Sequence, residues 1–314
     1  MGFTIECYRR SHLEGMLAVY HQETAFEPHI ARLSHETFIE LVEAKRHFDP
    51  QGLLVAVEKG QVVGWVHACV APGSEPHHDP QQRVPQIRML IFSRDRLPVG
   101  AALVAEATRW LRRASAGPLL ALHAQHGYPF YRGLWLGAEP MGPATMPHVQ
   151  LALEVAGYQN TQESVFMTAT INPPLTPPLS AAPVELVESA AELRHEGMRE
   201  SWIGFRPMRT RALVGGEEVG SVGWVVIPHL RDTLGAPAVN IWSLGVAQGH
   251  RRRGIATWLL AHTLARGYEQ GARFASVGTQ LWNAPAHATY AKLGFSPHCI
   301  VVGRTLSGRE SEND

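Results

Sequence analysis

Cysteine, long apolar runs and an excess of one charge are all scarce in this sequence. The 314 residues include three cysteines, far apart, which form neither a disulfide framework nor a zinc-binding spacing. No apolar run approaches the roughly 18 residues that a membrane-spanning helix needs. The 28 basic residues balance the 28 acidic ones, which gives no electrostatic basis for binding nucleic acid. We therefore expect a cytoplasmic protein with no nucleic-acid or membrane partner; its oligomeric state is left open.

Apolar residues are plentiful, at 45% against 18% charged residues, which is typical of a globular protein with a sizeable core. The 17 histidines raise the question of a metal site. Their densest cluster, His77 and His78 beside Asp79, has proline and glycine on both sides and is therefore predicted to be a loop. Metal sites need several ligands that converge from a fixed scaffold, so we predict a solvated loop here and no metal site.

A proline-rich run, INPPLTPPLSAAP, occupies residues 171–183. Its five prolines are incompatible with a helix or a central strand, so it is predicted to be a linker. We place one domain at 1–171, the linker at 172–183 and a second domain at 184–314.

The two halves have the pattern of diverged copies. Three pairs of similar segments occur in the same order, with the linker between the two sets, which favours a duplication. The pairs are VVGWVHA and SVGWVVI, from Val62 and Ser221; LLALHAQ and FASVGTQ, from Leu119 and Phe274; and VQLALEVAGY and HATYAKLGF, with Gly157 set against Gly294.

The second half has periodicities that predict an α+β layout with one mixed sheet. The expected helices are 190–202, 254–267 and 284–293, and the expected strands are 210–215, 219–228, 238–246, 274–279 and 299–306.

The segment NIWSLGVAQGHRRRGIATWLL, residues 240–260, carries the clearest functional signal. A predicted strand ends at Val246, and a predicted helix begins near Gly254 after a short loop. The start of a helix presents unpaired N–H groups and a partial positive charge, which suit a pyrophosphate. Gly254 and Ala256 are small enough for phosphate oxygens to approach the main chain, and the arginines at 251–253 add charge.

This segment resembles the acetyl-CoA signature of the GNAT acetyltransferase superfamily: Arg or Gln, two variable residues, Gly, one variable residue, then Gly or Ala. Arg251, Gly254 and Ala256 stand at its fixed positions. A second motif of the family, NAPAHATYAKLGF, follows at 283–295, and the similarity covers 184–306. The resemblance implies two tandem GNAT-like domains, each a mixed β-sheet flanked by helices.

The resemblance also implies residue roles. Leu244 and Val246 would offer backbone groups to the acyl carbonyl and the pantetheine arm of acetyl-CoA, and Tyr290 would protonate the departing thiolate to give coenzyme A. Tyr290 as a core aromatic and Asn283 as a helix cap are the alternatives. The residues expected to contact the coenzyme are Leu244, Val246, Arg251, Arg252, Arg253, Gly254, Ile255, Ala256 and Asn283.

The first half departs from the signature. Asp95 stands near the expected arginine, Pro98 replaces the glycine, and Leu153 takes the place of Tyr290. We therefore expect this domain to be degenerate and unable to bind the coenzyme in the usual way. An aromatic insertion, HGYPFYRGLWLG at 126–137, has no counterpart in the second half. It is expected near the interface between the halves or at the acceptor pocket; packing on the first half alone is the alternative.

The resulting hypothesis is an acetyl-CoA-dependent N-acetyltransferase that transfers an acyl group to the primary amine of a small molecule, by direct attack in a ternary complex. His229, Asp232 and Glu200 are candidate bases, although water can take that role. Acylation of a protein N-terminus or lysine, an amino-thiol acceptor, and a non-catalytic acyl-CoA-binding module stay open as alternatives.

Overall fold

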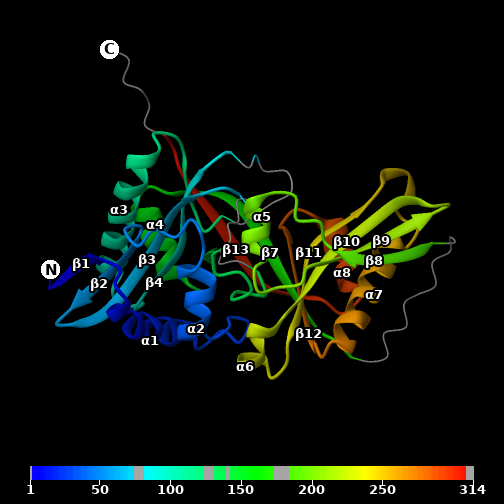
Figure 1. Cartoon of the computed structure of the whole chain (residues 1–314), viewed down its shortest axis with the longest axis horizontal. Coiled ribbons are helices and arrows are strands. Elements are labelled where there is room, and N and C mark those ends of the chain that lie inside the picture. Colours follow the sequence, from blue (N-terminus) through cyan, green and yellow to red (C-terminus); the bar gives the residue numbers. More distant parts are fainter. Residues whose placement is uncertain are drawn as a thin grey trace, which may run out of the picture.

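The computed structural model of this chain describes residues 2–73, 79, 81–123, 130–138, 142–172 and 184–308. His77, His78, Tyr128 and most of the predicted linker lie outside these residues. Figure 1 shows the elements of the first half on one side of an elongated molecule and those of the second half on the other. The strands are β1 Phe3–Cys7, β2 Leu53–Glu58, β3 Gln61–Ala71, β4 Val84–Phe92, β5 Leu119–Ala121, β6 Gly142–Pro143, β7 Gln159–Thr170, β8 Glu185–Ala190, β9 Met208–Val214, β10 Glu217–Ile227, β11 Ala238–Val246, β12 Phe274–Gln280 and β13 Ser296–Leu306. The helices are α1 Leu13–Thr24, α2 His35–Phe38, α3 Leu97–Ala114, α4 Pro147–Val155, α5 Glu196–Ser201, α6 Arg231–Leu234, α7 Ile255–Glu269 and α8 Ala284–Ala291.

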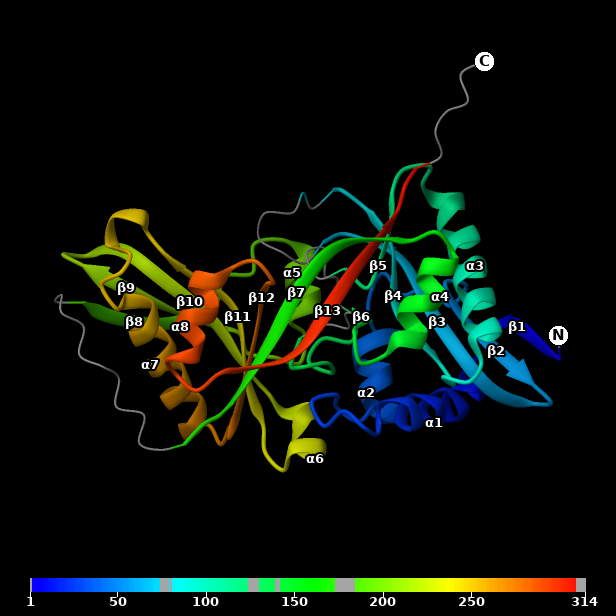
Figure 2. The ribbon, with the colours of Figure 1, turned by 180° about the vertical axis from the view of Figure 1, so that it is seen from behind.

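The strands form one continuous sheet that runs through both halves. Its order is β1-β2-β3-β4-β5-β13-β7-β12-β11-β10-β9-β8, and β6 pairs with β13. The two halves exchange strands at the centre, because β13 lies beside β5 of the first half and β7 lies beside β12 of the second. β7 and β13 also pair with each other, and Figures 1 and 2 show them side by side, in green and red.

The sheet is mixed in both halves, which confirms the predicted α+β class. β4 is parallel to β5, β11 is parallel to β12, and the remaining pairs are antiparallel. The similar segments of the two halves occupy equivalent places: β3 and β10, β5 and β12, and α4 and α8.

The repeated Gly-Trp pair has the same structural role in each half. Trp65 in β3 and Trp224 in β10 are fully buried in their respective cores. Each indole N–H has a partner: the carbonyl of Met16 for Trp65, and the hydroxyl of Thr210 for Trp224, both at 3.1 Å. The repeated pattern therefore reflects packing, since a buried indole needs both a close-fitting core and an acceptor for its N–H.

One predicted helix of the second half is wrong over most of its length. Residues 190–202 contain good helix formers, but Ala190 is the last residue of β8, where it pairs with Met208 of β9. Only α5, Glu196–Ser201, is helical. Pairing across the sheet therefore overrides the local preference at Ala190, whereas residues 191–195 lie in neither a helix nor a strand.

The two halves meet at a seam formed by residues 130–138 against the second half. The guanidinium of Arg132 lies 3.8 Å from the ring of Trp202, and the hydroxyl of Ser276 donates to the carbonyl of Leu136. A Cβ at Gly133 would lie 2.8 Å from Phe205, so glycine permits this close contact. The described part of the aromatic insertion therefore lies at the interface between the halves, as expected, while the ring of Tyr131 packs on the first half against His67.

Candidate functional site

The site begins where two parallel strands separate. β11 and β12 pair from Ala238 opposite Phe274 to Ile241 opposite Val277. Trp242 is then the extra residue of a bulge in β11, between the pairs Trp224–Ile241 and Gly223–Ser243. Beyond it β11 continues to pair with β10, but not with β12. The edge of β11 that faces β12 is therefore open to a ligand along residues 243–246.

The start of α7 follows β11 in the sequence and lies at the same opening. Gly254 precedes the helix with a φ of 82°, and Arg252 also has a positive φ, 60°. No side chain caps the helix, so the N–H groups of its first turn have no acceptor within the helix. A Cβ at Gly254 would meet nothing within 4 Å, and Gly254, Ile255 and Ala256 all line the same cleft. Left-handed residues before a helix form a concave anion-binding site.

The three consecutive arginines differ in their positions. All three are exposed, but only Arg251 and Arg252 line the cleft in front of α7. The Nε of Arg251 donates to the carbonyl of Val246 at 3.0 Å. This bond ties the loop to the end of β11, so Arg251 both adds charge and fixes the shape of the loop.

These features surround one cleft of about 1020 Å³ between β11, β12, α7 and α8. Its cations are His250 when protonated, Arg251, Arg252 and Lys292, and no acidic residue lines it among the residues that the structure describes. The sign of this charge suits an anionic ligand. The sequence-predicted residues that line the cleft are Leu244, Val246, Arg251, Arg252, Gly254, Ile255, Ala256, Asn283 and Tyr290.

Tyr290 reaches this cleft from α8. It is 5% exposed, and burial raises the pKa of its phenol to about 12, so the proton stays on at neutral pH. Its ring packs against Phe295 with centroids 5.9 Å apart. Its hydroxyl has no hydrogen bond to any residue in the described part of the chain, although the ring is packed as a core aromatic would be.

Asn283 is held as a helix cap. Its side-chain oxygen accepts from the amide of Ala286 at 3.4 Å, and its amide group donates to the hydroxyl of Thr279 at 3.1 Å. These two bonds account for its side chain. Asn283 also lines the cleft, together with Thr279, so both interpretations made from the sequence agree with its position.

Sequence reasoning missed several residues of the cleft. Trp242, Ser243 and Thr279 line it because the two strands separate beside them, and nothing in their own side chains signals this. His250 and Lys292 belong to segments that the sequence motifs already covered, so a count of cations around Gly254 could have found them. None of the candidate bases lines the cleft: the carboxylate of Glu200, for example, accepts from the amide of Arg46.

The equivalent place in the first half is built differently. The cations of its loop pair with carboxylates, Arg94 with Glu23 at 3.5 Å and Arg96 with Glu58 at 2.5 Å. α3 packs closely against α4, and Leu153 of α4 is fully buried. The charges that would attract an anion are therefore already neutralised in this half.

Comparisons with known proteins agree with this architecture. Residues 174–295 match the sequence model of the Acetyltransferase (GNAT) family. This match covers most of the second half of the chain. Among solved structures, a tandem GNAT protein from the clavulanic acid biosynthesis pathway is 17% identical with a TM-score of 0.69, over 99% of this chain and 100% of that one. The chain therefore has the tandem GNAT fold, with the family-matched GNAT domain at its C-terminal side.

Two further structures are similar over nearly the whole chain. A GCN5-related N-acetyltransferase from Sphaerobacter thermophilus is 16% identical with a TM-score of 0.63, over 98% of this chain and 96% of that one. An N-myristoyltransferase from Saccharomyces cerevisiae with bound myristoyl-CoA is 9% identical with a TM-score of 0.59, over 98% and 80%. No curated protein sequence gives a significant match. No described helix of this tandem GNAT chain is both long and apolar enough to cross a membrane.

Proposed function

We propose that this chain is an acetyl-CoA-dependent N-acetyltransferase that acylates the primary amine of a small molecule, by direct attack in a ternary complex. The observation that carries the proposal is the single cleft in which the open edge of β11, the uncapped start of α7 and Tyr290 meet. The cationic lining and the family match of this half support an acyl-CoA as the donor.

The residues of the cleft fit such a donor. The N–H groups after Gly254, with Arg251 and Arg252, would hold the pyrophosphate, because they combine unpaired donors with positive charge. The backbone of Leu244 and Val246 would hold the pantetheine arm along the open edge of β11. When bound, the coenzyme supplies the acyl group as a thioester.

Tyr290 would serve as the general acid. Because burial holds its pKa near 12, the phenol keeps its proton until a stronger base forms beside it. A thiolate is a weaker base than this phenolate, since thiols have a pKa of about 8.5, so the phenol assists the departing sulfur mainly by donating a hydrogen bond to it. The contribution expected from this proton is therefore modest.

The first half would not provide a second coenzyme site. Its loop cations are paired with Glu23 and Glu58, and Leu153 replaces the phenol. Its contribution would be structural, through the exchanged strands and the seam.

A thiol-release assay tests the proposal. The full chain is incubated with acetyl-CoA and a panel of small primary amines, an amino-thiol, and peptides with a free N-terminus or lysine. Amine-dependent release of thiol from a small amine supports the proposal, whereas activity only on peptides favours protein acylation. Coenzyme binding with no thiol release for any acceptor would instead favour a non-catalytic binding module.

A further inference from the structure

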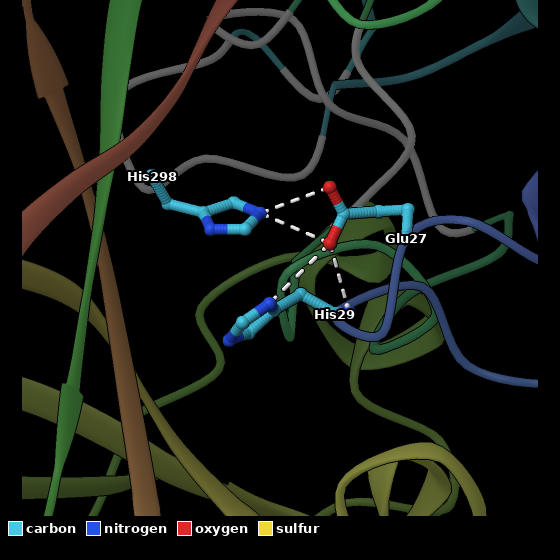
Figure 3. Close-up of side chains that lie close together, drawn as sticks. All are labelled: Glu27, His29 and His298. Atoms are coloured by element: carbon cyan, nitrogen blue, oxygen red, sulfur yellow. Dashed lines mark hydrogen bonds and ion pairs between the residues drawn. The ribbon is translucent and has the colours of Figure 1, made fainter.

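Three potential metal ligands converge at the seam, apart from the acyltransferase cleft. Glu27 and His29 follow α1 in the first half, and His298 lies in the exchanged strand β13; Figure 3 shows both imidazole rings facing the carboxylate. The Nε2 of His298 lies 3.0 and 2.9 Å from the two oxygens of Glu27. The Nδ1 of His29 lies 3.3 Å from Oε1 of the same carboxylate. The three ligand atoms all lie within 4.8 Å of one another.

The fold fixes each of these side chains from a different direction. His298 is the extra residue of a bulge in β13, between Pro297 and Cys299, and a bulge re-aims the side chain that it carries. The amide of His29 donates to Glu27 at 3.0 Å, and its carbonyl accepts from the amide of Leu136 at 2.7 Å. The cluster therefore forms only when the two halves have exchanged strands.

The sequence around both histidines is alike. Residues 26–30 read FEPHI and residues 295–299 read FSPHC, so each histidine follows a proline that restricts the backbone before it. The two histidines are 269 positions apart, so nothing in the sequence shows that they lie together.

The charge of the cluster is not balanced by a permanent cation. The Glu27 side chain is 8% exposed, and its ion-pair partners in the described part of the chain are the two histidines. A buried carboxylate needs a paired cation or a metal ion. Lysine and arginine do not provide it here, which leaves a protonated imidazole or a bound metal ion.

The spacing of the ligand atoms suits a metal ion. Nitrogen and oxygen ligands lie about 2.0–2.2 Å from zinc, so two ligands at tetrahedral or right angles lie roughly 2.9–3.5 Å apart. The observed separations between carboxylate oxygens and imidazole nitrogens, 2.9 to 3.3 Å, fall in this range. Two imidazoles and a carboxylate are ligands that first-row transition metals prefer.

We propose that Glu27, His29 and His298 bind one divalent first-row transition-metal ion, with Zn²⁺ as the best match, and that this ion joins the two halves at the seam. The histidine side chains are 17% and 21% exposed, which leaves a route for the ion and a coordination position for water. None of these three residues lines the acyltransferase cleft, so this proposal does not depend on the proposed function.

The test uses the full chain after treatment with a chelator. We expect one equivalent of Zn²⁺ in a calorimetric titration, a rise in melting temperature with added Zn²⁺, and visible absorption bands when Co²⁺ replaces it. His298→Gln and Glu27→Gln should each weaken Zn²⁺ binding at least tenfold. His262→Gln is the matched control, because His262 also lies 3.6 Å from a carboxylate, that of Glu188, but belongs to no three-ligand group among the described residues.

Two results would overturn the proposal. One is the absence of stoichiometric Zn²⁺ or Co²⁺ binding to the folded parent chain, which would make the cluster an ion pair with a protonated histidine. The other is parental metal affinity in both variants, which would place the metal at other histidines. Circular dichroism of each variant shows that it is folded, and the Co²⁺ spectrum of the parent decides the matter if a variant is not.

Discussion

At the scale of single residues, one substitution of Tyr290 can separate the role of its ring in packing from the role of its hydroxyl in catalysis. Tyr290→Phe keeps the ring against Phe295 and removes only the hydroxyl. We expect kcat and kcat/KM to fall together by roughly 10–100-fold, at the low end for general acid catalysis, with nearly unchanged affinity for acetyl-CoA. Steady-state kinetics and calorimetry measure both quantities. Tyr268→Phe is the control, because Tyr268 does not line the cleft. A parental rate for Tyr290→Phe would show that Tyr290 only packs.

Gly254 offers a second test on one residue. Its φ of 82° is strained for any other residue, and a side chain there would add bulk at a residue that lines the cleft. Gly254→Ala should therefore weaken acetyl-CoA binding about tenfold or more. Gly235 has a φ of 80° and also open space, so Gly235→Ala carries a similar backbone cost of roughly 1–2 kcal/mol without affecting the cleft. Equal coenzyme affinity in the two variants would contradict the prediction.

The residues of the cleft were predictable from sequence only where a local motif marks them. Gly254 and Tyr290 stand in short motifs whose chemistry is local. Gly254 marks the start of α7, and Tyr290 supplies a phenol from α8. Trp242 and Thr279 could not be predicted, because they line the cleft only through the point at which two strands separate. Glu27 and His298 could not be paired either, since strand exchange alone brings them together.

At the scale of elements, we expect opposite results from charge changes in the two loops before α3 and α7: the loop before α7 should matter for acetyl-CoA binding, and the loop before α3 should not. Arg251→Glu should weaken acetyl-CoA binding by about tenfold or more, since a charge-assisted hydrogen bond contributes roughly 1.5–3 kcal/mol. Asp95→Arg should create no second site, because Arg94 and Arg96 of the same loop are already paired. Calorimetry should give one site per chain for the parent and for Asp95→Arg.

Arg253→Glu is the matched control for this comparison. It changes the net charge by the same amount as Arg251→Glu, but Arg253 does not line the cleft. Its effect on affinity should be clearly smaller. Two equal sites in the parent chain, or equal losses in the two arginine variants, would show that the phosphates lie elsewhere.

The elements themselves were predicted well where the pattern is strong. The expected strand 238–246 coincides with β11, and the expected helix 254–267 differs from α7 by one residue at its start and two at its end. The exchange of β7 and β13 between the halves could not be predicted from the sequence, because an alternating strand has the same pattern whichever neighbour it pairs with. β8 was missed because no expected element covered residues 185–189, and its last residue, Ala190, was assigned to the expected helix 190–202.

At the scale of the whole molecule, the continuous sheet predicts joint unfolding of the two halves. Each half would lose a strand of its sheet without the other half, because β13 pairs with β5 of the first half and β7 pairs with β12 of the second. We expect a single calorimetric transition, with calorimetric and van't Hoff enthalpies that agree. Two well-separated transitions would contradict this and would indicate that each half is stable alone.

Acid stability should depend strongly on His67. This side chain is fully buried, and burial, with the nearby charge of Arg88, lowers its pKa to about 3. The unfolded chain takes up this proton near pH 6.5 and the folded chain does not. Stability is therefore complete above about pH 6.5 and falls by up to about 1.4 kcal/mol per unit as the pH drops toward 3.

Denaturant unfolding at several pH values measures this dependence. His67→Gln should reduce the slope of unfolding free energy against pH between 4 and 6 by up to one proton, whatever its effect on absolute stability. His35→Gln, at an exposed position, is the matched control for the loss of one histidine. An unchanged slope for His67→Gln would contradict the prediction.

The strand exchange also determines when β5 can complete its pairing during translation. β5 ends at Ala121, and the strand that pairs with it, β13, begins at Ser296. At about 5–20 residues per second, a ribosome needs roughly 9–35 s to synthesise the stretch between them. During that time β5 has no native partner on this side, and an open strand edge invites pairing with other chains. A nascent chain that stalls before β13 is therefore exposed to aggregation, although its first half has long been translated.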